Sequence, residues 1–413
     1  MLLLERYTGH QATVNVDGSA RPVTASARGA PWGDLRHSGV VTTTEQWWLG
    51  ALATQRVLDL GPEHPSRAGL VGLTVDLDDD RHVAAARIQP GFLHRGAEKL
   101  FEVRDYRQVL MLADRHDWQA SFSGELVAAL ACEQLLGLSA PERAVWLRTL
   151  LAEVARIGSH LGFLSYVPHA TGNRELAQRV RHARDAGRAL MLSLSGNRLH
   201  PMLNRLGGLA VDASPQWWQE LDAWLGEVAR LSFTEAIAAL DLPTGLGRLG
   251  ARQINDFGIS GPAARASGVE LDLRRSPGYL AYQELDHEIT PANSTNGDTS
   301  SRFTALEYDI QSSVMVVREC AERLRGLAGP VNVKLSRIIK LPDAEVWLNV
   351  EAPFGVAGIH LVSRGGTTPW RFKLRTPTFA QVNVLQQVLV GVHMEKVPDV
   401  VASFGYTIGD LDK

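Results

Sequence analysis

The hydrophobic and polar residues of the chain follow three successive patterns. Between residues 70 and 88, apolar and polar positions largely alternate on either side of an acidic run at residues 78–80, which predicts a β-hairpin. From about residue 104 to residue 241 the apolar positions recur with the helical period instead. Three strand-like runs follow residue 343. This order predicts an α+β fold, in which a central helical bundle is flanked by small N-terminal and C-terminal antiparallel sheets.

Three amphipathic helices are the clearest predicted elements. The first is expected to begin at a capping box formed by Ser139 and Glu142, with Pro141 in the first turn. Its apolar stripe comprises Leu147, Leu150, Leu151, Val154, Ile157, Leu161 and Leu164. A second helix is expected from about Gln216, with one apolar face made of Trp217, Leu221, Trp224, Leu225, Val228 and Leu231. A third is expected over about residues 302–326.

The same patterns divide the chain into four regions. Residues 1–55 are expected to be an N-terminal extension, and residues 56–103 an N-terminal β region. Residues 104–330 are expected to form the helical bundle, with long loops where Gly, Pro, Asn and Ser gather between residues 242 and 300. Residues 331–413 are expected to form a C-terminal β region.

The last predicted strand has two different faces. Trp370, Phe372 and Leu374 are expected to point one way, and Arg371, Lys373 and Arg375 the other. The cationic face predicts either a solvated surface or a contact with another subunit.

Composition and charge narrow the possible functions. Of 413 residues, 45% are hydrophobic and 21% charged, which is typical of a soluble globular protein. The formal charge of -3 provides no field for polyanions, so nucleic acid is not expected as a partner. The three leucines near the N-terminus are too few for a signal peptide, and the longest uncharged run, residues 376–394, contains proline and several amides. We therefore expect neither a signal peptide nor a membrane span.

Metal and nucleotide sites have little support in the sequence. Cys132 and Cys320 are far apart, and the 13 histidines form no H-E-x-x-H or similar ligand pattern, so no metal is expected. No glycine-rich phosphate-binding motif follows a strand and opens a helix. His160 lies on the flank of an apolar stripe, where a structural histidine is more common than a ligand.

Short motifs spread over residues 57–413 carry a resemblance to a known family. The most specific are Leu-Gly-Pro-Glu-His-Pro at residues 60–65 and Gly-Phe-Leu-His-Arg-Gly-Ala-Glu-Lys at residues 91–99, followed by Tyr106 and Gln108. Further matches occur in order at residues 141–143, 156–161, 204–208, 260–268, 296–302, 351–353 and 409–412. Together they resemble the D subunit of complex I, whose fold is shared with the large subunit of [NiFe]-hydrogenases.

The resemblance distinguishes complex I from hydrogenase. Hydrogenase members hold nickel and iron with two C-x-x-C pairs. The corresponding stretches here, residues 115–120 and 405–413, contain no cysteine. Because such a centre needs four thiolates, the chain is expected to bind no metal and not to be a hydrogenase.

The resemblance also implies a setting for the chain. It implies a subunit of a proton- or ion-translocating NADH-quinone oxidoreductase-like complex, without activity of its own. The implied partners are B-, C- and I-type subunits and membrane-arm subunits, with an iron-sulfur cluster in the neighbouring B subunit and a quinone as candidate substrate. Other subunits would hold the chain at the cytoplasmic face of the membrane.

Positions around the implied quinone cavity depart from the family. Family members present the quinone with a histidine, a tyrosine and an aspartate, and these places hold Ala68, Trp118 and Ala170 here. His64 and Tyr106 remain as candidates to contact the acceptor or to provide protons. Arg115 and His200, which the family turns toward the cluster, are both present.

Two interpretations stay open at this point. In the first, the chain forms the cavity between the terminal cluster and a quinone or other apolar acceptor, with the usual head-group residues replaced. In the second, it is a non-catalytic scaffold or coupling paralogue in a divergent or hydrogenase-related energy-converting complex.

Overall fold

The computed structural model describes residues 71–413 apart from residues 278, 288 and 291–293, together with the backbone of three short strands nearer the N-terminus. These strands are β1 (Thr13–Val16), β2 (Ser19–Pro22) and β3 (Gln55–Val57). His64 and Ala68 therefore lie outside the described residues.

Two long helices form the centre of the bundle. They are α5 (Glu142–Leu164) and α12 (Thr299–Gly326), which pack along each other. All residues of the predicted stripe on the first helix are buried, so that prediction is confirmed. Around the pair lie α4 (Ser121–Leu136), α6 (Tyr166–Ala170), α7 (Arg174–Ser195), α8 (Pro215–Val228) and α9 (Thr234–Ala238). The apolar face predicted for the second helix is buried in α8 and the residues after it.

The helix starts differ from their predicted positions. No capping box opens α5, because the cap residue is Pro141, which makes no side-chain cap bond. The helix begins at Glu142, so Ser139 lies two residues before the cap, and Pro141 has no N–H group that a side chain in the first turn could accept to complete a capping box. Helix α12 begins three residues earlier than expected, because the carboxylate of Asp298 accepts the backbone N–H of Ser301 at 2.9 Å.

The segment expected to form long loops over the bundle also contains short helices. They are α10 (Ala251–Phe257), α11 (Gly261–Arg265), η2 (Leu273–Arg275) and η3 (Tyr282–Glu284). Helix α11 begins against the C-terminal sheet, where a Cβ on Gly261 would lie 2.5 Å from the Cα of Gly355. Glycine at both positions allows this close backbone approach.

The C-terminal sheet has three antiparallel strands in the order β10-β9-β8. The strands are β8 (Asp343–Ala352), β9 (Gly355–Arg364) and β10 (Arg371–Arg375). The sheet packs on α4 and shares a second core with α3 (Tyr106–Ala113), which includes Phe372 and Leu374. Trp370 lies before the strand and is 66% exposed, so its predicted place on the apolar face is wrong.

The cationic face of β10 is covered in part by the chain itself. Helix α2 (Ala97–Glu102) lies against it, and Arg371 pairs with Glu98 at 2.5 Å and with Glu102 at 3.0 Å. Lys373 is 3.4 Å from Glu98. Part of the face is thus an intramolecular contact, which neither predicted alternative included, because the acidic partners lie more than 260 positions away in sequence. Lys373 remains exposed, as the solvated alternative expected.

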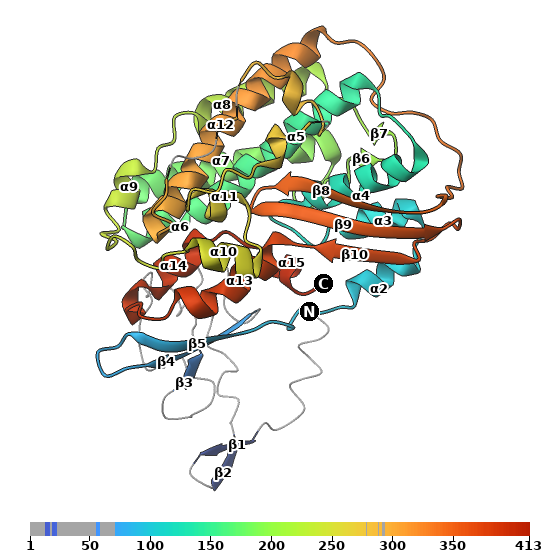
Figure 1. Cartoon of the computed structure of the whole chain (residues 1–413). Helices are drawn as coiled ribbons and strands as arrows, with labels where there is room; N and C mark the ends of the chain where they lie inside the picture. The colour runs from blue at the N-terminus through green and yellow to red at the C-terminus, as the bar shows by residue number, and fades with distance from the viewer. Residues whose placement is uncertain are drawn as a thin grey trace.

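The C-terminal region contains helices as well as strands. After β10 come α13 (Pro377–Val388), η4 (Met394–Lys396), α14 (Val397–Ser403) and α15 (Ile408–Leu411). Helix α13 contacts β5 (Val83–Gln89), which pairs with β4 (Gly72–Leu77) as the predicted hairpin. Figure 1 shows these C-terminal helices between the bundle and the hairpin.

This arrangement of helices with small antiparallel sheets confirms the α+β fold. Among the described residues, no helix is both long enough and apolar enough to cross a membrane.

Candidate functional site

The loop between α3 and α4 carries several of the predicted site residues. It begins at Asp114, which ends α3, and continues through Arg115 and Trp118 to Ala120, the cap of α4. The side chain of Asp117 accepts the backbone N–H groups of Gln119 at 3.2 Å and Ala120 at 3.1 Å. These bonds shape the loop and leave Arg115 exposed and Trp118 half-buried.

Arg115 and His200 come together around one buried carboxylate. An oxygen of Asp114 contacts Nδ1 of His200, and its other oxygen accepts the N–H of Met202 at 3.2 Å. The positive charges of His200 and Arg115 both favour ionised Asp114, but its complete burial outweighs them and raises its pKa. The two residues expected to face a cluster therefore lie beside each other.

A second buried carboxylate bonds to the segment that follows His200. Glu125, on α4, accepts the N–H of Leu203 at 3.1 Å. Burial raises its pKa to about 8, and the nearby charge of Asp114 adds to that shift. Sequence reasoning missed both carboxylates, although Glu125 and Glu133 within the largely apolar α4 are a usable signal, because acidic side chains are rarely buried unless they have a partner.

Trp118 lines a cavity of about 100 Å³ between α5, α7, α8 and the His200 loop. Leu199 and Pro201, on either side of His200, line the same cavity. Its wall also includes the apolar side chains of Met191 and Trp224. The cavity therefore lies between Trp118, which is predicted at a quinone position, and the loop that carries His200, which is predicted to face a cluster.

The donors in this cavity do not readily release protons. The indole of Trp118 has one N–H donor, and Arg184, Arg188 and Arg198 add guanidinium donors. Such groups hydrogen-bond to carbonyl oxygens, but arginine stays charged and indole stays neutral near neutral pH. The cavity can orient a carbonyl acceptor more readily than it can protonate one.

The ring of Trp118 packs closely against a glycine. A Cβ on Gly409, in α15, would lie 2.4 Å from Cζ3 of the indole and 2.5 Å from the carbonyl oxygen of His116. Any side chain at this position would therefore displace either the tryptophan or the loop. The C-terminal segment and the loop after α3 thus form one unit.

The remaining predicted site residues lie elsewhere. Tyr106 is buried below the C-terminal sheet, where its hydroxyl bonds to Ser363 at 3.2 Å and to the carbonyl of Thr368 at 3.1 Å, and burial raises its pKa. Ala170 is the last residue of α6 and packs half-buried on the core. Neither is among the described residues that line the cavity beside Trp118.

His160 has a structural environment, as expected from its position on the helix. Its Nε2 lies 2.8 Å from the carbonyl oxygen of Pro353, and burial lowers its pKa to about 4. Within the part of the chain that the structure describes, no three His, Cys, Asp or Glu side chains are arranged to hold a metal ion.

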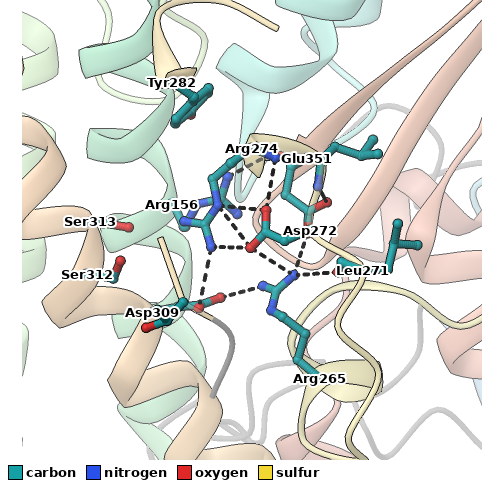
Figure 2. A network of polar contacts seen from close by, with 12 residues as sticks. Arg156, Arg265, Leu271, Asp272, Arg274, Tyr282, Asp309, Ser312, Ser313 and Glu351 are labelled. Atoms are coloured by element: carbon teal, nitrogen blue, oxygen red, sulfur yellow. Dashed lines mark hydrogen bonds and ion pairs between the residues drawn. The ribbon is translucent and has the colours of Figure 1, made fainter. Parts of the chain in front are cut away.

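A buried ionic network next to His160 was not predicted. Arg265 pairs with Glu351 and Asp309, each at 2.7 Å, while Arg274 pairs with Asp272 at 2.7 Å. The group also includes Glu153 and Arg156 of α5, which are 3.1 Å apart. Figure 2 shows Arg156 of α5, Arg265 of α11, Asp309 of α12, Arg274 of η2 and Glu351 of β8 meeting around Asp272, which caps η2. The sequence showed only Arg156, Arg265 and Glu351, as separate motif positions.

Comparisons with known proteins identify the family of the chain. The family model described as "Respiratory-chain NADH dehydrogenase, 49 Kd subunit" matches residues 172–413. The second NADH-quinone oxidoreductase D subunit of Salinispora tropica is 42% identical over 391 residues, which are 92% of this chain and 98% of that protein. The NADH-quinone oxidoreductase D subunit of Deinococcus radiodurans is 32% identical, over 86% of this chain and 95% of that protein.

A solved structure has the same fold. It belongs to the membrane-bound sulfane sulfur reductase, an archaeal respiratory membrane complex, and matches with a TM-score of 0.79 and 28% identity. The match covers 88% of this chain and 100% of that one. These findings confirm the resemblance inferred from the sequence motifs, and the chain belongs to the family of NADH-quinone oxidoreductase D subunits.

Proposed function

We propose that this chain forms the wall between an iron-sulfur cluster of a neighbouring B-type subunit and an acceptor cavity in a complex I-like NADH-quinone oxidoreductase. The observation that carries the proposal is the position of His200, which is held by Asp114 beside Arg115 on a loop that also lines the cavity of Trp118. The complex would translocate protons or other ions. C- and I-type subunits and membrane-arm subunits would hold the chain at the cytoplasmic face of the membrane.

The electrostatics of the loop support the cluster side of this proposal. A cluster gains negative charge when it is reduced, and a nearby guanidinium such as Arg115 stabilises that state. The bond between His200 and the buried Asp114 fixes the imidazole on the same loop that lines the cavity, so both predicted cluster-facing side chains lie beside one carboxylate.

The cavity supports an apolar acceptor with carbonyl oxygens, of which a quinone is the simplest example. Its wall combines apolar side chains with N–H donors of Trp118 and of three arginines. These donors replace the hydrogen bonds that the family makes with histidine and tyrosine at the positions of Ala68 and Trp118. The acceptor would be oriented at Trp118 and reduced across the His200 loop.

The proposal is tested by quinone reduction in the assembled complex, with Trp118→Ala compared against Trp370→Ala. Loss of one aromatic contact of about 1.4 kcal/mol predicts a roughly tenfold lower kcat/KM for a short-chain quinone. Trp370 is exposed at the entrance to β10, so its variant should behave like the wild type.

Two results would contradict this assignment. Equal kcat/KM for Trp118→Ala and the wild type would place the acceptor elsewhere. A wild-type complex that assembles but reduces no quinone would favour the scaffold and coupling role instead.

A further inference from the structure

Two buried carboxylates meet behind the loop that carries Trp118. Asp117 belongs to that loop and Asp410 to α15, and they are only 6% and 5% exposed. Thr407 connects them, because its hydroxyl donates to Oδ1 of Asp117 at 2.6 Å and its carbonyl accepts the N–H of Asp410 at 2.9 Å. The contact brings together segments 290 positions apart in sequence.

Both carboxylates line a small internal cavity of about 30 Å³, together with His116 and Arg375. This volume is sufficient for one water molecule. Among the described residues, Oδ2 of Asp410 and Nδ1 of His116 have no hydrogen-bond partner, although both atoms are buried. Buried polar atoms without a partner are rare in folded proteins, so these two indicate a site that exchanges protons or water.

The charges around the pair do not neutralise it fully. Arg375 lines the cavity, but its guanidinium donates to the carbonyls of Val356 and Gly258. Lys413 is also nearby, and its ammonium donates to the carbonyl of Leu374 at 2.9 Å. Burial lowers the pKa of His116 to about 4, so this side chain is neutral at pH 7.

Burial raises the pKa of both carboxyl groups. The hydrogen bonds from Thr407 and from the loop N–H groups oppose this shift at Asp117. At Asp410 the negative charge of Asp117 adds to the effect of burial, and the pKa of Asp410 is raised furthest. When two buried carboxyl groups interact in this way, ionisation of one disfavours ionisation of the other.

We propose that Asp117 and Asp410 share one proton at neutral pH and deliver it to the acceptor cavity beside Trp118. Gln119 and Ala120, whose N–H groups bond to Asp117, line that cavity, and Gly409 beside Asp410 touches the indole. The inference rests on the proposed function, because it assigns a proton donor to a cavity whose own N–H groups are poor acids.

Electrons and protons balance when the acceptor is a quinone. The proposed cluster of the neighbouring subunit would supply two electrons, one at a time, and the quinone becomes a quinol when it takes up these electrons and two protons. One proton leaves the carboxyl O–H of the pair and forms an O–H bond with a quinone oxygen. The second comes from solvent water, which also returns a proton to the pair after each turnover.

The first test is infrared spectroscopy of the full-length chain at pH 7, which detects protonated carboxyl groups by their C=O stretch. Asp410→Asn should remove the band of the shared proton, because Asp410 is the carboxyl whose pKa is raised furthest. Asp117→Asn should shift the band, because it removes the charged neighbour of a carboxyl that burial keeps protonated. Asp399→Asn is the matched control and should keep that band, since Asp399 is equally buried, is bonded to Tyr166 at 2.8 Å and lies outside this cavity. If neither variant at the pair removes or shifts a band, the shared proton does not exist.

The second test is turnover of the assembled complex with saturating quinone. Each single variant should lower kcat by at least about tenfold with little change in KM, and the double variant should be no slower than either single one, because the pair acts as a unit. Asp399→Asn should retain wild-type kcat. Unchanged kcat in variants that lose the infrared band would overturn the delivery of the proton.

The two tests separate this inference from the proposed function. A wild-type complex without quinone turnover contradicts the proposed function, whereas the infrared band of the full-length chain still tests the proton site. If an asparagine variant does not fold, Thr407→Val removes the connecting hydroxyl and should shift the same band. An unshifted band in that variant would also count against the pair.

Discussion

The molecule buries carboxylates in two different ways. In the network of Figure 2, each acidic group has an arginine partner at close range, as Asp309 and Glu351 have in Arg265. At the pair behind Trp118, Asp117 and Asp410 have hydroxyl and amide donors, while the nearest cations are engaged with backbone carbonyls. The two regions therefore place similar side chains under opposite electrostatic conditions.

The pKa shifts follow this difference at most of these groups, but Glu351 is an exception, because burial and the negative charge of Asp272 outweigh its arginine partners and raise its pKa. Arginines lower the pKa of Asp309 and Glu153 although both are fully buried, whereas burial raises the pKa of Asp117, Asp410 and Glu125. A buried ion pair remains charged and joins elements together, while an unpaired carboxyl remains able to exchange a proton. We interpret the network as structural and the unpaired carboxyl groups as functional.

The largest expected effect is on the network. Arg265→Met would leave Asp309 and Glu351 buried without their closest cation, which should lower the free energy of unfolding by about 3–5 kcal/mol. Urea denaturation of the full-length chain, followed by circular dichroism, measures this change. Arg252→Met is the control, because the Arg252 side chain is 92% exposed and its pair with Asp256 is solvated. Equal stability of the two variants would contradict a structural role for the network.

A smaller effect is expected at Glu125, which belongs to the buried carboxyl groups that are bonded by amide donors rather than by arginines, here called the unpaired class. Its folded-state pKa of about 8 lies above the unfolded value, so protonation stabilises the fold at low pH and this contribution is lost as pH rises toward 8. Between pH 6 and pH 7, the wild type should lose about 1.4 kcal/mol relative to Glu125→Gln.

Urea denaturation at several pH values measures this difference. Glu235→Gln, at an exposed position in α9, should leave the pH dependence of the wild type unchanged. If Glu125→Gln and the wild type change in parallel with pH, Glu125 is ionised in the folded chain and the assignment to the unpaired class is wrong.

The sequence predicts the bundle and the strands well because their patterns are local. The stripe from Leu147 to Leu164 repeats within one helix, and burial of that stripe needs no knowledge of its partner. A local pattern can suggest a capping side chain, but it does not show at which residue the helix begins. Helix α5 begins at Glu142 with Pro141 as its cap, so the predicted cap at Ser139 was wrong.

The candidate site was predictable only in part, because contacts between segments far apart in sequence bring its residues together. Arg115, Trp118 and His200 follow from motif spacing, but their grouping depends on Asp114, which bonds to His200 across 86 positions. The contact between Thr407 and Asp117 spans 290 positions, and no periodicity connects them. Tyr106 belongs to a matched family motif and Trp118 replaces a family tyrosine, yet the fold places Tyr106 in the core below the sheet and Trp118 at the cavity.

The most direct test of the account is the midpoint potential of the iron-sulfur cluster in the assembled complex. It is measured by electron paramagnetic resonance at pH 7 in the wild type, in Arg115→Met and in Arg364→Met, a control on β9 whose exposed side chain pairs with Asp343. If the cluster lies against Arg115, loss of the guanidinium charge should lower the midpoint potential by on the order of 59 mV, which for one electron corresponds to about 1.4 kcal/mol. Arg364→Met should keep the wild-type potential. Equal potentials in all three complexes would contradict the placement of the cluster beside Arg115 and His200.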